Sequence, residues 1–345
     1  MREAELRASR RFGASWLRFA LWLGLPLALA WVLRDVSLAK LGEALGALTP
    51  GELALLCAVN VLVVLAFSGR WWALLRARGL RVPYLPLSAY RLAAFAVSYF
   101  TPGTHFGGEP LQVHLVHQRE HVPLATATAS VVLDKTIELI ANFAFLAVGL
   151  AMVVRLGLQP AGSGLVLPAV SLLLLIIPGA YLIAAWRGRR PATWAAAKLG
   201  LRRAGSGWRA KLARGLEESE REVAVAAQGA PVGILAGAAF SALSWGLLLL
   251  EWAMALYFLE IHLSAGEVVA VVTAARLALF VPLPGAAGAL EASLLFAVTT
   301  LGYSSAQALS LALVIRVRDV AFGAIGLWLG GWLAGGRKKA GRNSS

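Results

Sequence analysis

The sequence predicts an all-α, polytopic helical membrane protein built from two inverted repeats, each containing a re-entrant broken helix. Three observations lead to this prediction. The 345 residues are 59% hydrophobic and only 14% charged, and their mean hydropathy is +0.72. Several apolar runs reach the length of a membrane span. Two further apolar segments, 84–110 and 264–300, are interrupted by Pro-Gly and then a glutamate. We therefore expect a single transmembrane domain over 1–345, with about six full spans and two re-entrant segments.

Six apolar segments are long enough to cross a bilayer: 16–33, 52–69, 122–154, 165–186, 231–259 and 304–335. The first resembles a signal peptide, but its Ala-x-Ala (28–30) lies inside the apolar run. We therefore expect an uncleaved span. The second ends at Arg70-Trp71-Trp72. Tryptophans are enriched at membrane interfaces, so we expect both to be interfacial anchors.

Residues 187–230 differ in composition from the spans. They contain ten Lys/Arg, followed by the acidic cluster between Glu217 and Glu222. They are too poor in apolar residues to form a separate enzyme domain. We predict a basic cytoplasmic connector that contains an amphipathic helix lying along the membrane surface.

The formal net charge is +14, and most basic residues lie in loops between the spans. This arrangement favours a membrane surface over nucleic acid as their partner. The N-terminal tail has five Lys/Arg, 70–81 has four, the connector ten and the C-terminal tail four, against three in the opposite loops. The positive-inside rule then predicts a protein of the cytoplasmic (inner) membrane with both termini cytoplasmic. Cys57 is the only cysteine, so no intrachain disulfide can form.

The same charge asymmetry predicts the two re-entrant segments. The chain must cross the membrane an odd number of times between Arg81 and Arg155, yet two apolar segments lie between them. The simplest solution makes 84–110 re-entrant from the cytoplasm. The corresponding argument makes 264–300 re-entrant from the opposite side.

The two broken segments also match in sequence. Pro102-Gly103 precedes Glu109 by the seven positions that separate Pro284-Gly285 from Glu291. We therefore assign a first repeat to 52–155 and a second to 231–335. Inverted repeats of this kind occur in secondary transporters, whose substrate sites lie near the bilayer midplane.

Ten charged residues fall in the broken segments and in the helices that follow them. They are Arg91, Glu109, Asp134, Lys135, Glu138, Arg276, Glu291, Arg316, Arg318 and Asp319. A lone charge costs roughly 2.5–3.5 kcal/mol at the centre of a span, so most must be paired or hydrated. Two interpretations remain open. The charges form a hydrated pathway for a charged lipid headgroup, or they are structural ion pairs that join the repeats.

Glycines accompany both breaks, at Gly103, Gly107 and Gly108 in the first and Gly285 in the second. Backbone N–H groups at a helix N-terminus attract anions, so these elbows are candidate phosphate sites. The structural alternative is close helix packing, since glycine is common in membrane helices.

No cofactor or metal is expected. His114, His117 and His121 recur at helical spacing, but no zinc motif accompanies them. We expect them to be interfacial or to contact a headgroup. No phosphate-binding loop or nucleotide fingerprint is present, so we expect no use of ATP by this chain.

The segments PGTHFGGEP, ASVVLDKTIE, LPGAAGALE and ALVIRVRD resemble the lysylphosphatidylglycerol synthase transmembrane-region family, also described as flippase-like. The resemblance extends from about Phe19 to Leu333. In the second elbow Ala286 and Ala287 depart from the family's Gly-Leu, which leaves the fine backbone shape there open. The resemblance implies translocation of polar lipids by a stand-alone membrane domain, without the aminoacyl transferase domain of its bifunctional members.

We therefore expect a flippase, not an enzyme, that moves a polar or anionic phospholipid between leaflets without ATP. One alternative is a membrane enzyme acting on a lipid-linked substrate, with His105, Glu109 and His114 as its candidate groups. Another is a non-transporting scaffold for envelope-lipid synthesis. The expected partners are the lipid substrate and either a lipid-synthesis enzyme or a second copy of the chain, with no nucleic acid.

Overall fold

The computed structural model describes residues 48–101, 107–158, 166–198, 207–229 and 231–335, together with Gly42 and Gly46. It is helical throughout, with no β-strand within these ranges. Four helices are long and apolar enough to span a membrane: α3 (Pro50–Ala77), α6 (Leu124–Arg155), α7 (Val166–Trp186) over its residues 169–186, and α10 (Pro231–Phe258). The first predicted span, 16–33, lies outside the described residues.

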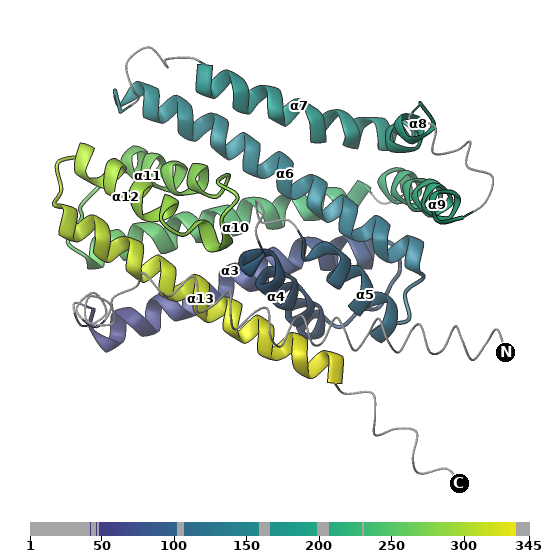
Figure 1. The fold of residues 1–345 in the computed structure, drawn as a ribbon, viewed down its shortest axis with the longest axis horizontal. Coiled ribbons are helices and arrows are strands. Elements are labelled where there is room, and N and C mark those ends of the chain that lie inside the picture. The colour runs from purple at the N-terminus through teal and green to yellow at the C-terminus, as the bar shows by residue number, and fades with distance from the viewer. Residues whose placement is uncertain are drawn as a thin grey trace, which may run out of the picture.

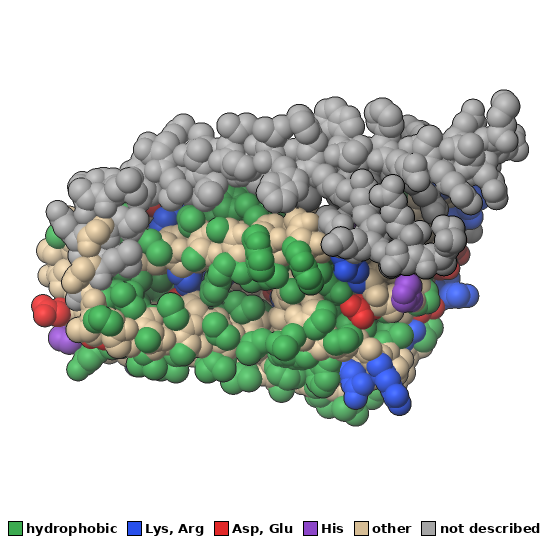
Figure 2. Space-filling view, turned by 90° about the horizontal axis from the view of Figure 1, so that it is seen from below, with side chains coloured by type: hydrophobic (Ala, Val, Ile, Leu, Met, Phe, Trp, Pro, Cys, Tyr) green, Lys and Arg blue, Asp and Glu red, His purple; other side chains and the backbone are tan. Residues whose placement is uncertain are grey.

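The outer surface fits an apolar solvent. Figure 2 shows hydrophobic side chains over the middle of one described face, with charged and histidine side chains mainly toward its two ends. Large apolar side chains such as Leu172, Ile176 and Leu235 are mostly exposed. An exposed apolar surface of this extent is costly in water and favourable in lipid.

The helices form two series with the same order of lengths. The first is α3, α4 (Tyr84–Phe100), α5 (Glu109–Arg119) and α6, of 28, 17, 11 and 32 residues. The second is α10, α11 (Ala265–Ala278), α12 (Ala289–Thr300) and α13 (Ser305–Gly335), of 28, 14, 12 and 31 residues. A single 3₁₀ turn, η2 (Pro284–Ala286), lies between α11 and α12. The second predicted broken segment, 264–300, is thus a pair of short helices, whereas the first, 84–110, contains α4 and only the start of α5, which continues to Arg119.

Local sequence explains where these helices begin. Thr49 caps α3 in a capping box, since its backbone N–H donates to Glu52 Oε2 at 2.7 Å and its hydroxyl accepts from the Glu52 N–H. Ser264 and Glu267 form the same box at the start of α11. Each box satisfies two helix-end N–H groups that would otherwise lack a partner.

Helix α3 continues beyond the predicted end of the second span and turns Trp71 into the protein. The Trp71 side chain is fully buried, and its indole N–H donates to Ser130 Oγ of α6 at 3.0 Å. The prediction of an interfacial Trp71 is therefore wrong. Arg70 is also buried rather than in a cytoplasmic loop. Both side chains find polar partners on α6, which keeps this turn of α3 inside the bundle.

The two series are interlocked. Helix α3 lies against α10, and α4 lies against α13. Gly326 permits the second contact, because a Cβ atom there would meet the Leu92 carbonyl oxygen and would lie 2.9 Å from Ala96 Cβ. Helix α6 contacts both series, and α7 covers α6 on the side away from α3 and α13 (Figure 1).

The connector contains α8 (Pro191–Lys198) and α9 (Trp208–Gly229). The predicted amphipathic helix corresponds to α9, which packs on α6 and α7. Both carboxylate oxygens of Glu220 accept from the first N–H groups of α8, at Ala192 and Thr193. This is the anionic partner that a helix N-terminus favours.

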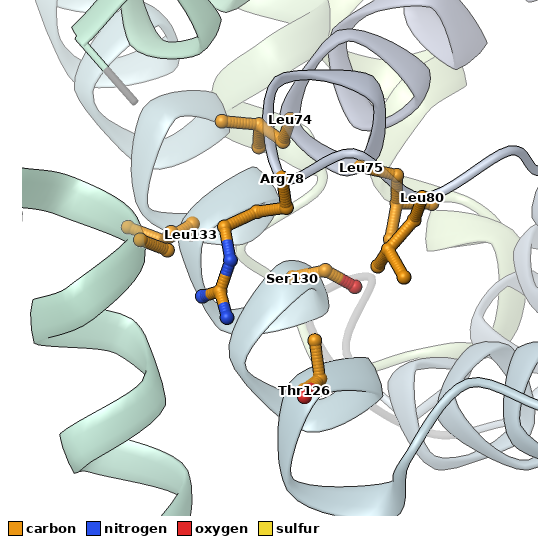
Figure 3. Close-up of a pocket in the computed structure, with 8 residues that line it drawn as sticks. Leu74, Leu75, Arg78, Leu80, Thr126, Ser130 and Leu133 are labelled. Carbon is orange, nitrogen blue, oxygen red and sulfur yellow. The ribbon is translucent and has the colours of Figure 1, made fainter. Parts of the chain in front are cut away.

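Arg78, at the end of α3, fixes α9 by an ion pair with Glu222 at 2.8 Å. Beside it lies a hollow bordered by Thr126, Ser130 and Leu133 (Figure 3). Its volume is about 10 Å³, which is room for one water at most. The hollow is therefore a packing detail and cannot hold a substrate.

Candidate functional site

A cavity of about 660 Å³ lies between the two helix series. Side chains from α3, α4, α6, α7 and from α10 to α13 line it. Its volume falls within the range of roughly 300–1,000 Å³ typical of sites for small organic ligands. Seven charged side chains of the described residues reach it: Arg91, Lys135, Glu138, Glu251, Arg276, Arg318 and Asp319.

A first charge cluster lies beside the cavity, and Arg91, Lys135 and Glu138 of this cluster line it. Its members are Arg70, Arg91, Glu109, Asp134, Lys135 and Glu138. Arg70 Nε lies 2.7 Å from Asp134 Oδ1. Arg91 donates to the other oxygen of Asp134 at 2.7 Å. Both arginines also donate to Glu138 Oε2, at 2.6 and 2.8 Å. Two guanidinium groups thus share two carboxylates, an arrangement of charge-assisted hydrogen bonds that fixes α3, α4 and α6 together.

The first elbow is connected to this cluster by Glu109, the first residue of α5. Lys135 Nζ lies 3.2 Å from Glu109 Oε1 and 2.8 Å from Glu138 Oε1. The other oxygen of Glu109 accepts from the Gly107 N–H, and the Gly108 N–H donates to Ser98 Oγ. The N–H groups of both glycines are therefore already used within the protein. Gly103 lies outside the described residues.

A second charge cluster lies on the other series. Its members are Glu251, Arg276, Glu291, Arg316, Arg318 and Asp319. Arg316 Nη2 lies 2.5 Å from Glu291 Oε1, and Arg316 Nη1 donates to Tyr99 Oη at 3.1 Å and to the Gly285 carbonyl. Arg316 therefore joins the second elbow to the end of α4. It is buried and does not line the cavity.

Arg318 connects the same helix to α10. Its Nη1 lies 2.6 Å from Glu251 Oε1, and its Nη2 lies 2.8 Å from Asp319 Oδ1. All three side chains line the cavity. The guanidinium is thus held between two carboxylates, and each of its three nitrogens has a carboxylate partner.

Arg276 differs from the other cations. Its guanidinium lies over the Trp245 ring, 4.9 Å from the ring centroid, a cation–π contact that orients it without neutralising its charge. The charged groups around it are Arg318, Asp319, Glu138 and Glu251. None of the described carboxylates forms an ion pair with it. Arg276 is therefore a cation facing the cavity with no acidic partner among these residues.

Most of the remaining lining is apolar, and Asn60, Thr136 and Asn142 are uncharged polar residues within it. Phe67, Phe95, Phe143, Phe280 and Trp245 surround the charged side chains. Helix α7 contributes one face, made of Leu174, Ile177, Pro178 and Tyr181. Pro178 has no N–H, so the backbone hydrogen bond to Leu174, four residues earlier, is missing at this point of the wall. The cavity thus combines a charged interior with hydrocarbon walls.

Six of the predicted site residues line the cavity: Arg91, Lys135, Glu138, Arg276, Arg318 and Asp319. Five others contact that set or the elbows from outside the lining: Gly107, Glu109, Asp134, Glu291 and Arg316. Gly108 and Gly285 shape the elbows themselves.

Sequence reasoning missed Arg70, Glu251, Asn60 and Tyr99. Glu251 had a usable signal, because it is a lone acid in the apolar run LLLLEWAMAL, and an ionisable residue inside a span marks a candidate site by default. The motif Arg70-Trp71-Trp72 had instead suggested an interface. Asn60 and Tyr99 had no comparable signal.

Among the histidines that the structure describes, none lines the cavity, and His105 lies outside the described residues. His117 Nδ1 lies 2.8 Å from the Val122 carbonyl oxygen, across the turn between α5 and α6. Within the described part of the chain, no three His, Cys, Asp or Glu side chains are grouped as metal ligands would be.

Comparison of the sequence with curated proteins finds no match. A family model described as Lysylphosphatidylglycerol synthase TM region matches residues 15–326, which is most of the chain. The apolar helices agree with that description, and the chain is an integral membrane protein of a family associated with lipid metabolism or transport. The chain therefore belongs to the Lysylphosphatidylglycerol synthase TM region family.

Proposed function

We propose that this protein moves a polar or anionic phospholipid between the two leaflets of the membrane, without ATP and without a chemical step. The observation that carries this proposal is the cavity itself, which places seven charged side chains inside walls of aromatic and aliphatic residues. A phospholipid has the complementary composition, since a charged headgroup is attached to hydrocarbon chains.

The physical obstacle to such movement is the headgroup. An isolated ion is strongly disfavoured in hydrocarbon, and the cavity offers polar partners at that depth. Arg276 is the cation best placed for a phosphate, because it has no ion pair among the described residues and a planar fork of donors that matches phosphate oxygens.

Release of the headgroup also has a structural basis. The lining contains four basic groups, Arg91, Lys135, Arg276 and Arg318, together with the acids Glu138, Glu251 and Asp319. The excess positive charge is small, so an anion is attracted but meets competing carboxylates. A transport site requires such moderate affinity, because binding must be reversible at both membrane faces.

The two helix series support an inverted-repeat architecture. They share the order and approximate lengths of four helices, and each break precedes a glutamate that is bonded to a basic residue of the long helix behind it. In this proposal both termini are cytoplasmic, α4–α5 is re-entrant from the cytoplasm and α11–α12 from the opposite side. The site then lies where the two broken segments approach each other.

The experiment is a leaflet-exchange assay in liposomes containing the purified protein and acyl-labelled fluorescent phosphatidylglycerol or phosphatidylethanolamine. Dithionite added outside bleaches only the outer leaflet, so protein-free vesicles lose about half of their signal on leaflet symmetry alone. We expect protein-containing vesicles to lose more than half, with no nucleotide present. Arg276→Ala should slow exchange by about tenfold or more, since a hydrogen bond to a charged group contributes about 1.5–3 kcal/mol.

The matched control is Arg155→Ala, which removes an exposed arginine at the end of α6 that does not line the cavity. It should exchange lipid at the wild-type rate. A signal that stays at half for every polar lipid tested, or an Arg276→Ala rate equal to wild type, would contradict the proposal.

A further inference from the structure

Two residues that line the cavity each have a buried side-chain oxygen that accepts no hydrogen bond within the described structure. These oxygens are Asn60 Oδ1 on α3 and Glu251 Oε2 on α10. The two side chains belong to residues only 7% and 2% exposed. A buried acceptor without a donor costs about 1–3 kcal/mol, so a donor from outside the described residues would be stabilised at either oxygen.

The orientation of the Asn60 amide is determined by its other contact. Asn60 Nδ2 donates to the Leu56 carbonyl oxygen at 2.8 Å. A carbonyl oxygen can only accept, so the amide nitrogen must face Leu56 and the amide oxygen must point away from it. The unpartnered atom of Asn60 is therefore an acceptor.

Glu251 likewise has one side-chain oxygen with a hydrogen-bond partner and one without a partner among the described residues. Its Oε1 accepts from Arg318 Nη1 at 2.6 Å, while Oε2 has no partner. A carboxylate oxygen accepts hydrogen bonds and donates none when ionised. The ion pair with Arg318 keeps the group in place and leaves the second oxygen for another donor.

Helix packing places Asn60 and Glu251 at a similar position along the paired helices α3 and α10. Helices α3 and α10 are antiparallel, with Gly69 facing Phe240 and Gly233 facing Ala77. Continued along both helices, this register places Asn60 within one turn of Glu251. Both residues line one cavity, which is also lined by Arg276, a cation with no ion pair among the described residues.

We propose that Asn60 and Glu251 form an acceptor subsite for an N–H or O–H donor on the lipid headgroup, next to a phosphate held by Arg276. This inference rests on the proposed role of the cavity as a lipid site and narrows its substrate. The preferred lipid carries a phosphate and a hydrogen-bond donor, either an ammonium or a hydroxyl. Lipids with a quaternary or fully capped headgroup fit the subsite less well.

The test compares pairs of lipids that have the same acyl chains and net charge but differ in donors. Purified protein in detergent is mixed with equal amounts of phosphatidylethanolamine and phosphatidylcholine, and bound lipid is counted by native mass spectrometry. A second mixture contains phosphatidylglycerol and phosphatidylmethanol. We expect the donor-bearing lipid to be preferred by about tenfold in at least one pair, which corresponds to about 1.4 kcal/mol. The two mixtures separate an ammonium donor from a hydroxyl donor.

Asn60→Leu and Glu251→Gln should each bring that preference close to one. Asn60→Leu replaces an unpartnered acceptor by apolar atoms of similar size, so folding should tolerate it, and it carries the test if Glu251→Gln folds poorly. Ser68→Ala is the control. Ser68 is a buried residue of α3 whose hydroxyl donates to the Val64 carbonyl oxygen, just as Asn60 Nδ2 donates to the Leu56 carbonyl oxygen. Unlike Asn60, Ser68 does not line the cavity. It should keep the preference.

Equal binding within both wild-type pairs would overturn the inference. A preference that survives in both variants would also overturn it, since selection by headgroup size does not need these oxygens. Leaflet exchange in liposomes is measured separately. Exchange without donor preference would reject the subsite alone, whereas donor preference without exchange would reject transport and leave the subsite standing.

Discussion

Asp134 is a buried acid that joins helices by ion pairs and does not line the cavity. It is 2% exposed and accepts from both Arg70 and Arg91. Breaking a buried ion pair by removing one partner typically costs about 3–5 kcal/mol, because an uncompensated charge is left behind. We therefore expect Asp134→Asn to lower the free energy of unfolding by about that amount. Thermal or denaturant unfolding in detergent, followed by tryptophan fluorescence, measures the change.

The control for this substitution is Glu217→Gln, which alters an exposed ion pair with Arg190 at 3.7 Å. Exposed pairs contribute about 0–1 kcal/mol, so this variant should be nearly as stable as wild type. Wild-type stability of Asp134→Asn would mean that the first charge cluster is hydrated and does not join the helices.

Individual residues show where prediction from the sequence stops. The presence of intramembrane charge at Asp134, Lys135 and Arg318 followed from their position in apolar helices. Their partners did not follow, because Arg70 and Asp134 are 64 positions apart and meet only when α3 packs on α6. Arg276 was predicted as one of ten similar charges, and its lack of an ion pair with any described carboxylate depends on tertiary packing alone.

At the scale of the helices, Gly108 controls how closely the first elbow packs. A Cβ atom added there would clash with the Ala94 carbonyl oxygen and would lie 2.8 Å from Ser98 Oγ. The nearest atom is a backbone atom, so α5 would have to move away from α4. This movement would separate Glu109 from Lys135 and break their ion pair. We expect Gly108→Ala to destabilise the protein by about 1–3 kcal/mol, as overpacking does, and to slow leaflet exchange.

Gly246→Ala is the comparison for that variant. Gly246 is a glycine of α10 with open space where a Cβ atom would be, and alanine favours a helix interior over glycine by about 0.5–1 kcal/mol. Unfolding in detergent should show no loss of stability for Gly246→Ala. Equal melting temperatures for the two variants would show that the elbow is not tightly packed.

Helix positions were the part of the fold that the sequence predicted best. The span predicted at 231–259 is α10, and the long helix predicted at 122–154 is α6. A clear difference is at α3, which extends to Ala77 where the prediction ended at residue 69. Its last turns contain Arg70 and Trp71, which are typical of an interface when their partners on α6 are unknown.

At the scale of the whole molecule, the two described helix series interlock rather than form two separate halves. Tyr99 of the first series packs closely against the second elbow, since a Cβ atom at Gly285 would lie 2.8 Å from the Tyr99 ring. Arg316 contacts both Tyr99 and Gly285. Such contacts between residues 217 positions apart have no local sequence signal. The matching Pro-Gly and glutamate spacings predicted that the two elbows correspond, and packing brings the end of α4 against the second elbow.

The proposed inverted topology predicts that the two elbows are reached from opposite sides of the membrane. The lone cysteine, Cys57, is exposed and is first replaced by alanine. New cysteines are then introduced at Pro110, next to the first elbow, and at Leu283, next to the second, both exposed positions. In right-side-out vesicles, a membrane-impermeant maleimide should label Leu283→Cys but not Pro110→Cys, and inverted vesicles should give the opposite result.

Leu212→Cys in α9 and Leu156→Cys beyond α6 report the cytoplasmic and outer sides. Labelling of both elbows from one side only would rule out the inverted arrangement, because the charge asymmetry that predicts it requires one elbow on each side.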